Sequence, residues 1–157
     1  MSQPYQQQQQ PQRFPILLST MNDVPGYRVV RVFGEVFGLT VRSRNMFSNM
    51  GAGFKALAGG ELKGLSKLLS DSRYEALGRL AQEAMQFGAN AVVALRFDCN
   101  EIANTASEIA AYGTAVYLVP ENADGQQAAA QYSQAQAQGQ AQAQAQYQQT
   151  QGQYQGQ

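Results

Sequence analysis

A chain of 157 residues has room for one domain and little more. Lysine and arginine together number 11, as do aspartate and glutamate, so we expect no attraction of the whole chain to nucleic acid or anionic lipid. One cysteine and no histidine exclude an intrachain disulfide and a closed Cys/His zinc site within one chain.

Both ends of the chain are poor in the apolar residues that build a core. Residues 1–13 are mostly glutamine, and no charged residue occurs from Gln126 onward. Such segments bury too little apolar surface to offset the entropy lost on ordering. We therefore predict a disordered N-terminus at residues 1–13, a folded domain at 14–120 and a disordered tail at 121–157.

The compartment follows from what the chain lacks. The first residues show no basic region followed by an apolar one, and no apolar run is long enough to span a bilayer. The single Cys99 suits a reducing compartment. We predict a cytoplasmic protein with neither a membrane nor a nucleic acid as partner.

The first predicted element is a strand. It begins at Tyr27 after the Pro25-Gly26 turn signal, in a sequence (YRVVRVF) rich in valine and aromatic residues. It continues through GEVFGLTV, where Gly34 and Gly38 indicate a kink, a bulge or a close backbone approach. A short helix is predicted next, at Met46–Ala58.

A long helix with one apolar stripe follows a break at Gly59-Gly60. At about 100° per residue, one direction gathers Leu62, Leu65, Leu69, Arg73, Ala76, Leu80, Ala84 and Phe87. Gly88 then stands where a left-handed cap ends a helix. Because Arg73 lies within the stripe, we predict that it is buried and structural, paired with a carboxylate or carbonyl, rather than a ligand anchor.

Two more strands are predicted after the helix. They are Ala91–Phe97 (AVVALRF) and Ile109–Val119, with a polar loop at Asn100–Ser107 between them. In the second of these, Gly113 indicates a bulge, and Pro120 ends the strand.

These elements define a fold class. A strand, a crossover helix and a strand make the first two strands parallel, and the hairpin return makes the third antiparallel to the second. The third strand then lies between the other two. We predict a two-layer β-α-β-β fold of the α+β class, its sheet covered by one long helix, with Gly88 and Asn90 holding the tight helix–strand joint.

Two surfaces of this fold lack a cover. The sheet face opposite the helix carries apolar residues, namely Val92, Ala94, Val116 and Leu118. A second line of apolar or small residues follows the helix through Tyr74, Gly78, Ala81 and Met85. We predict that both contact a neighbouring subunit. The alternative is that residues 46–58 or a piece of the tail cover the helix line within one chain.

Candidate chemistry is sparse. Near the predicted loop, a thiol and three carboxyl groups could hold a metal ion, on Cys99, Asp98, Glu101 and Glu108; the competing interpretation is ordinary solvated acids at a strand end. Gly59-Gly60-Glu61 lacks the spacing of a phosphate-binding loop. The chain has no histidine to act as a base and no pair of carboxylates at a spacing typical of acid–base catalysis, so we predict that the protein is not an enzyme.

Ordered motifs give the chain a family resemblance. GEVFG at Gly34–Gly38, SRYEAL at Ser72–Leu77, GANAVVALRFD at Gly88–Asp98 and YGTAV at Tyr112–Val116 resemble the YbjQ-like family of small bacterial proteins, described as "putative heavy-metal-binding". The resemblance covers residues 16–119. It implies a dodecin-subunit-like fold, a ring-shaped pentamer and a transition or heavy metal ion as ligand. The chain departs from the family at Lys63–Lys67 (KGLSK), where an aromatic residue often occurs.

Two functions remain open at this point. One is a non-enzymatic, homo-oligomeric binding protein of the YbjQ-like type, with metal binding implied by the resemblance. The other is a scaffolding ring whose low-complexity tails, with tyrosines spread through Gln/Ala repeats, make weak multivalent contacts.

Overall fold

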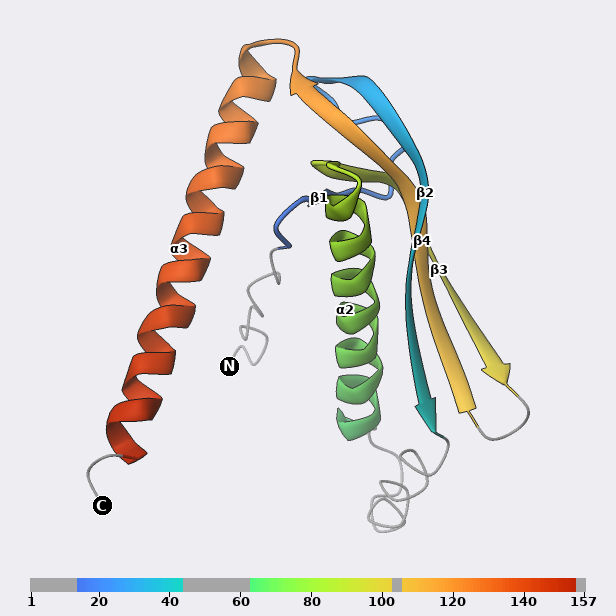
Figure 1. The fold of residues 1–157 in the computed structure, drawn as a ribbon, viewed down its shortest axis with the longest axis vertical. Coiled ribbons are helices and arrows are strands. Elements are labelled where there is room, and N and C mark those ends of the chain that lie inside the picture. The colour runs from blue at the N-terminus through green and yellow to red at the C-terminus, as the bar shows by residue number, and fades with distance from the viewer. Residues whose placement is uncertain (1–13, 44–62, 103–105, 155–157) are drawn as a thin grey trace, which may run out of the picture.

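The computed structural model describes residues 14–43, 63–102 and 106–154 (Figure 1). Along the chain it places β1 (Leu17–Leu18), β2 (Tyr27–Ser43), α2 (Lys63–Gln86), β3 (Ala91–Ile102), β4 (Ala106–Pro120) and α3 (Ala123–Tyr154). The strands form one sheet in the order β1-β3-β4-β2. The predicted helix at residues 46–58 and the Gly59-Gly60 break lie outside the described residues.

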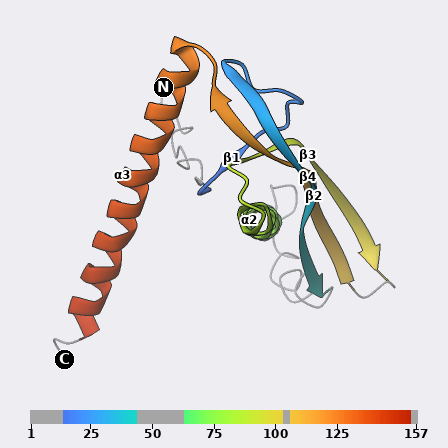
Figure 2. The same cartoon turned by 45° about the horizontal axis from the view of Figure 1, so that its top comes forward.

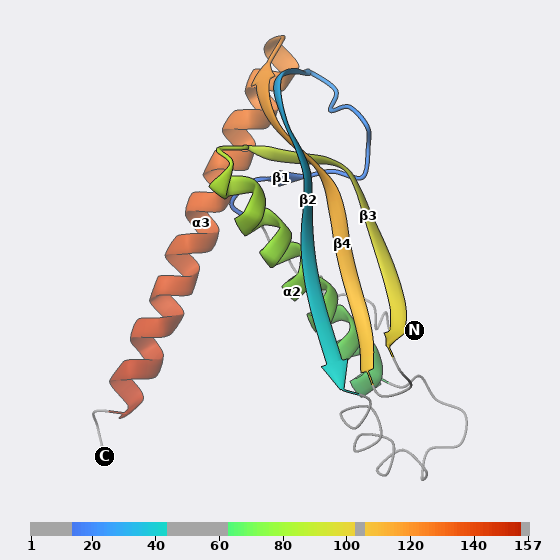
Figure 3. The ribbon, with the colours of Figure 1, turned by 45° about the vertical axis from the view of Figure 1, so that its right-hand side comes forward.

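The predicted topology is confirmed. β4 lies between β2 and β3 and runs antiparallel to both, so β2 and β3 run parallel to each other (Figure 3). Helix α2 is the crossover between them and covers one face of the sheet, mainly over β2 and β4. The fold is of the α+β class, as expected.

The strand β1 was not predicted. It adds to the far side of β3 in parallel, with Leu17 opposite Ala91 and Leu18 opposite Val92. Two residues are too few to show the alternation of polar and apolar residues that marks a strand. The predicted polar loop at Asn100–Ser107 is also shorter than expected, because β3 runs on to Ile102 and β4 begins at Ala106.

Three glycines mark the irregular places of the sheet. Gly34 has a φ of 119° at a register shift in β2, as a bulge requires. A Cβ on Gly38 would lie 1.9 Å from the Ala76 carbonyl oxygen, so α2 approaches β2 directly at this point. The bulge predicted at Gly113 is instead in β3, where Ala94 has a φ of 53° and Gly113 leaves space opposite it.

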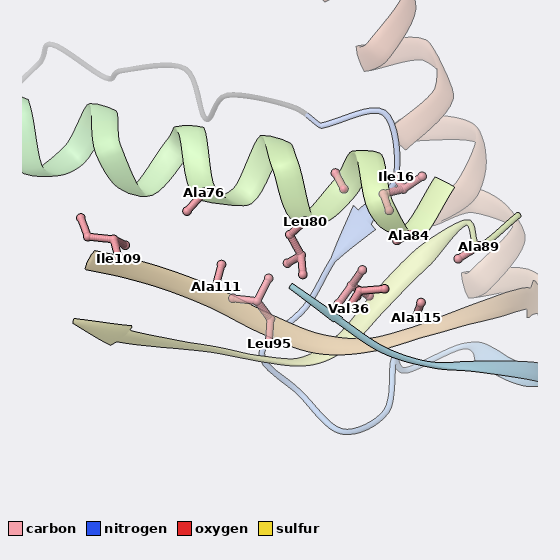
Figure 4. Close-up of a cluster of buried hydrophobic side chains, with 12 residues drawn as sticks. Ile16, Val36, Ala76, Leu80, Ala84, Ala89, Leu95, Ile109, Ala111 and Ala115 are labelled. Atoms are coloured by element: carbon pink, nitrogen blue, oxygen red, sulfur yellow. The ribbon is translucent and has the colours of Figure 1, made fainter. Parts of the chain in front are cut away.

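The core lies between α2 and the sheet (Figure 4). Ala76, Leu80 and Ala84 are all fully buried and point at the sheet, so the predicted stripe is right at its centre. They meet Val36 of β2 and, from β3 and β4, Leu95, Ala111 and Ala115. Small residues on the helix face bring it close to the strands.

The predicted burial of Arg73 is wrong. Arg73 is exposed, and so is Phe87 at 54% of its surface, while Ser72 and Ala81 are buried at 1% each. The buried face is therefore turned relative to the predicted stripe, toward smaller side chains. The reason is the close contact at Gly38, which admits small residues and leaves no room for a guanidinium group.

Gly88 and Asn90 form the tight joint as expected. Gly88 has a φ of 83°, its N–H donates to the Met85 carbonyl at 2.9 Å, and the Ala89 N–H donates to the Ala84 carbonyl at 3.1 Å, which is a Schellman cap. The Asn90 side chain donates to the Leu118 carbonyl at 2.8 Å and accepts from the Leu118 N–H at 2.7 Å. This amide takes the place of a further rung between β3 and β4.

The sheet face away from α2, called the outer face below, is partly covered by the chain itself. Val116 and Leu118, predicted to be bare, are 1% and 5% exposed and pack with Leu17, Val24 and Tyr27. Val92 is fully buried in the main core. The cover comes from β1, the segment after it and the first residue of β2, because the chain has to pass from one edge of the sheet to the other.

The prediction of a disordered tail is wrong for residues 123–154, which form α3. Alanine and glutamine are good helix formers, and propensity outweighs the lack of an apolar face. Figure 2 shows α3 standing apart from α2 and the sheet over most of its length. Among the described residues, no helix combines the length and the apolar character needed to cross a membrane.

Candidate functional site

The bare part of the outer face lies on β2. Phe37, Leu39 and Val41 point away from α2 and are 50%, 44% and 55% exposed. The Phe37 ring lies 6.4 Å from that of its cross-strand neighbour Tyr112. Contiguous exposed apolar side chains of this kind are a common feature of interaction sites.

Polar groups border this apolar row on the neighbouring strands. Leu39 is paired with Ala110, which in turn is paired with Asp98 of β3. Val41 is paired with Glu108 of β4, which in turn is paired with Asn100 of β3. The Asn100 Nδ2 donates to Glu108 Oε2 at 3.4 Å. The outer face therefore changes from apolar on β2 to charged and polar on β3, as a partner-binding patch with a polar rim does.

The predicted metal ligands do not come together within one chain. All lie on strands rather than in a loop, and β-alternation separates them. Cys99 is paired with Ile109, which faces α2, whereas Asp98 and Glu108 are on the outer face. Across the described part of the chain, no group of three or more Cys, Asp or Glu side chains could hold a metal ion.

Cys99 is nevertheless exposed. It lies on the α2 side of the sheet, but α2 covers β2 and β4 rather than the end of β3. Glu101 follows on the same face by alternation and is exposed as well. One thiol and one carboxylate on an open strand end make half of a metal site at most.

The predicted helix line is partly covered by the segment before β1. Tyr74 stacks on Phe14 with ring centroids 6.4 Å apart, and Ala81 is buried in the cluster that contains Ile16. Met85 is 44% exposed, and a Cβ on Gly78 would meet no atom within 4 Å. The helix line is thus open at Gly78 and Met85. At Tyr74 and Ala81 it is covered by the segment before β1.

Side chains of α2 hold the open edge of β2. The Phe37 N–H donates to Glu83 Oε2 at 2.6 Å, and Arg79 donates to the Leu39 carbonyl. Both backbone groups point away from β4, where a further strand would bind. The helix therefore occupies the middle of this edge, which is one way that proteins protect edge strands.

The row Phe37–Leu39–Val41 was missed from the sequence, although a signal for it exists. Between Val36 and Arg42 the inward positions hold Val, Gly, Thr and Arg, and the outward positions hold Phe, Leu and Val. The larger apolar side chains thus point away from the single helix. Large apolar side chains on the strand face without a helix are the signal in the sequence that marks this row.

Comparison with known proteins decides the family. A family model described as "Putative heavy-metal-binding" matches residues 16–119. The chain belongs to the YbjQ-like family. The matched residues include β1, β2, α2, β3 and all of β4 except Pro120, and end before α3.

Several relatives in the YbjQ-like family bear the name "UPF0145 protein". A "UPF0145 protein" of Mycobacteroides abscessus is 61% identical over 105 residues, covering 67% of this chain and 98% of the relative. A protein of the same name from Lactococcus lactis subsp. cremoris is 54% identical over 103 residues, covering 66% and 94%. That from Streptomyces avermitilis is 55% identical over 104 residues, covering 66% and 86%.

One solved structure is similar in part. It is a protein of unknown function from Pediococcus pentosaceus, assigned to the DUF74 family, with a TM-score of 0.45 and 15% identity over 66% of this chain and 98% of that one. At this TM-score the likeness carries no argument. The geometry of the YbjQ-like domain described above is what bears on function.

Proposed function

We propose that the chain is a non-enzymatic, homo-oligomeric binding protein of the cytoplasm, assembled as a pentameric ring. The observation that carries the proposal is the exposed row Phe37–Leu39–Val41 on the outer face. Three large apolar side chains in line, continued by Tyr112, make a contiguous patch that a second copy of the chain would remove from water.

The helix α2 supports the same proposal. Glycine in the middle of a helix costs about 1 kcal/mol relative to alanine. Gly78 stands in the middle of α2, and no described atom of its own chain lies near enough to require a glycine. Close approach of a neighbouring subunit beside Gly78 and Met85 supplies the missing reason.

Metal binding, which the family description names, does not fit one chain. Cys99 and Glu101 lie on one face of the sheet, and Asp98 and Glu108 lie on the other. A closed site would need donors from more than one copy. The metal part of the proposal therefore depends on assembly and has to be tested separately.

Light scattering on the full chain tests the assembly. We expect a mass of five times the 17.1 kDa chain. Leu39→Glu should lower that mass, because it buries a charge in the apolar patch, whereas Gln127→Glu on the exposed side of α3 should not. A monomeric full chain, or a folded Leu39→Glu variant of unchanged mass, would contradict the proposal.

Calorimetric titration with zinc, copper, cadmium and nickel tests the metal part. We expect binding to the wild-type oligomer and its loss in Cys99→Ser, because the thiolate is the donor that these ions prefer. Leu39→Glu should also lose binding if donors come from two copies. If the wild type gives no binding heat with any of the four ions, the metal part of the proposal is contradicted. The proposed pentamer would not be affected by that result.

A further inference from the structure

The outer part of α3 carries a sequence pattern that a helix cannot use. From Gln134 to Gln146, glutamine occupies every even position, and alanine or glycine every odd position. Successive odd positions lie about 200° apart around a helix, so the alanines scatter over its whole circumference. In a strand, the same alternation puts every alanine on one face and every glutamine on the other.

Beyond Gln136, the structure leaves this part of α3 without support. Contacts with the folded body involve one face at its start, where Tyr132 and Gln136 donate to the Phe14 carbonyl. From residue 137 to residue 145 every residue is exposed. In Figure 1 the later part of α3 lies away from α2 and the sheet. The pattern is therefore not explained by packing within the chain.

Ion pairs between side chains do not stabilise this part of α3 either. No Lys, Arg, Asp or Glu follows Asp124, so this stretch has no i,i+4 ion pair. Gly139 adds a residue that costs about 1 kcal/mol relative to alanine, with nothing within 4 Å to require it. The outer helix rests on the propensities of alanine and glutamine alone.

We propose that Gln134–Gln146 is a self-association segment, which leaves the helix to pair as a β-strand with the same segment of a second copy of this chain. Identical strands stacked in register let glutamine amides form hydrogen-bonded ladders along one face. The alanine and glycine face is flat and packs closely against a second such face. With no charge in the segment, in-register stacking meets no like-charge repulsion.

The alternation of glutamine with alanine or glycine favours a second copy of this chain over a helical partner. A helical partner would need an apolar seam at heptad spacing, which the scattered alanines do not form. A second copy presents the same two faces in the same register, so both are satisfied at once. The inference does not rest on the ring proposed above, because each chain carries the segment whatever its domain assembles into.

The full chain, incubated at rising concentration, provides the test. We expect a loss of helical circular dichroism, a rise in thioflavin fluorescence and fibre reflections at about 4.7–4.8 Å and about 10 Å. The matched control keeps the composition of residues 134–146 but reorders them so that alanines recur at i and i+4. It should stay helical and dispersed under the same conditions.

Several outcomes would overturn the inference. The first is a wild-type chain that stays helical and dispersed at every concentration. The second is assembly that keeps the helical signal, which would indicate pairing of helices instead. The third is equal conversion of the reordered control, which would assign assembly to composition rather than alternation.

Discussion

Arg42 joins β2 to α2 through two side chains of the helix. Its Nε donates to Ser72 Oγ at 3.1 Å, and its guanidinium group pairs with the Glu75 carboxylate. Glu75 also pairs with Arg79 at 2.5 Å. Because Ser72 is 1% exposed and itself donates to the Leu68 carbonyl, the arginine is tied to a buried hydroxyl as well as to a charge.

The contributions of Arg42 and Arg73 to the free energy of unfolding can therefore be compared. Arg42→Met should lower the free energy of unfolding by about 1–2 kcal/mol, because it removes a hydrogen bond to a buried group and one to a charged group. Arg73→Met, at an exposed position, should stay within about 0.5 kcal/mol of the wild type. Urea unfolding at one fixed protein concentration measures both, and the reverse ranking would restore the buried role first predicted for Arg73.

The contact between α2 and β2 has its closest point at Gly38. A Cβ there would meet backbone atoms on two sides, 1.9 Å from the Ala76 oxygen and 2.5 Å from the Leu80 nitrogen. Backbone cannot turn aside as a flexible side chain can. The whole helix would have to move away from the sheet.

Gly38→Ala and Gly78→Ala place the same methyl group on the two sides of α2, and their effects on stability can be compared. Gly38→Ala should destabilise the fold by about 3 kcal/mol, at the upper end of overpacking. Gly78→Ala should stabilise the isolated chain by about 0.5–1 kcal/mol, because it meets open space and improves helix propensity. Thermal unfolding of both variants in the Leu39→Glu chain, in which the proposed oligomer does not form, checks this prediction. A loss of stability in both would mean that Gly78 is closely packed within its own chain.

Elements with strong local signals were predictable from the sequence. β2 is marked by Val and aromatic residues after a turn, α2 by Ala76, Leu80 and Ala84 at helical spacing, and the joint by Gly88. The strand order followed from the single crossover and the hairpin. These features depend on residues near each other in sequence or on chain connectivity.

Other features depend on contacts between distant residues, which periodicity cannot supply. The rotation of α2 that exposes Arg73 goes with the close approach of Ala76 and Leu80 to Gly38, which is far away in the sequence. The separation of Cys99 from Asp98 and Glu108 appeared only when the predicted loop proved to be paired strands. The prediction of four metal donors in one site failed for that reason.

At the scale of the whole molecule, the start of the described chain is held by the first half of α3. Tyr132 of α3 donates to the carbonyls of Phe14 and Ile16, at 2.8 Å and 2.7 Å, and a Cβ on Gly125 would lie 2.0 Å from the Gly26 carbonyl oxygen. The segment held by Tyr132 is the same one that stacks on Tyr74 of α2. The first half of α3 is therefore part of the folded body, whereas the second half is not.

Two truncations separate these halves. A chain ending at Gln136 should keep the wild-type free energy of unfolding within about 0.5 kcal/mol, because it retains the contacts with Phe14 and Ile16. A chain ending at Asn122 should lose about 1–3 kcal/mol, since each lost hydrogen bond contributes about 0.5–1.5 kcal/mol. Urea unfolding at matched concentration measures both, and equal stability of the two chains would show that α3 contributes nothing to the fold.

The position of β2 in the sequence bears on the order in which the chain folds. β2 is complete at Ser43, yet its partner β4 begins only at Ala106, whereas β3 and β4 are neighbours in the chain. Pairs distant in sequence form slowly, because the intervening chain has to be ordered first. During synthesis β2 therefore leaves the ribosome long before β4, with Phe37 and Leu39 uncovered and without Glu83 and Arg79 at its edge. Until α2 and β4 arrive, both edges of β2 are open to pairing with a neighbouring nascent chain.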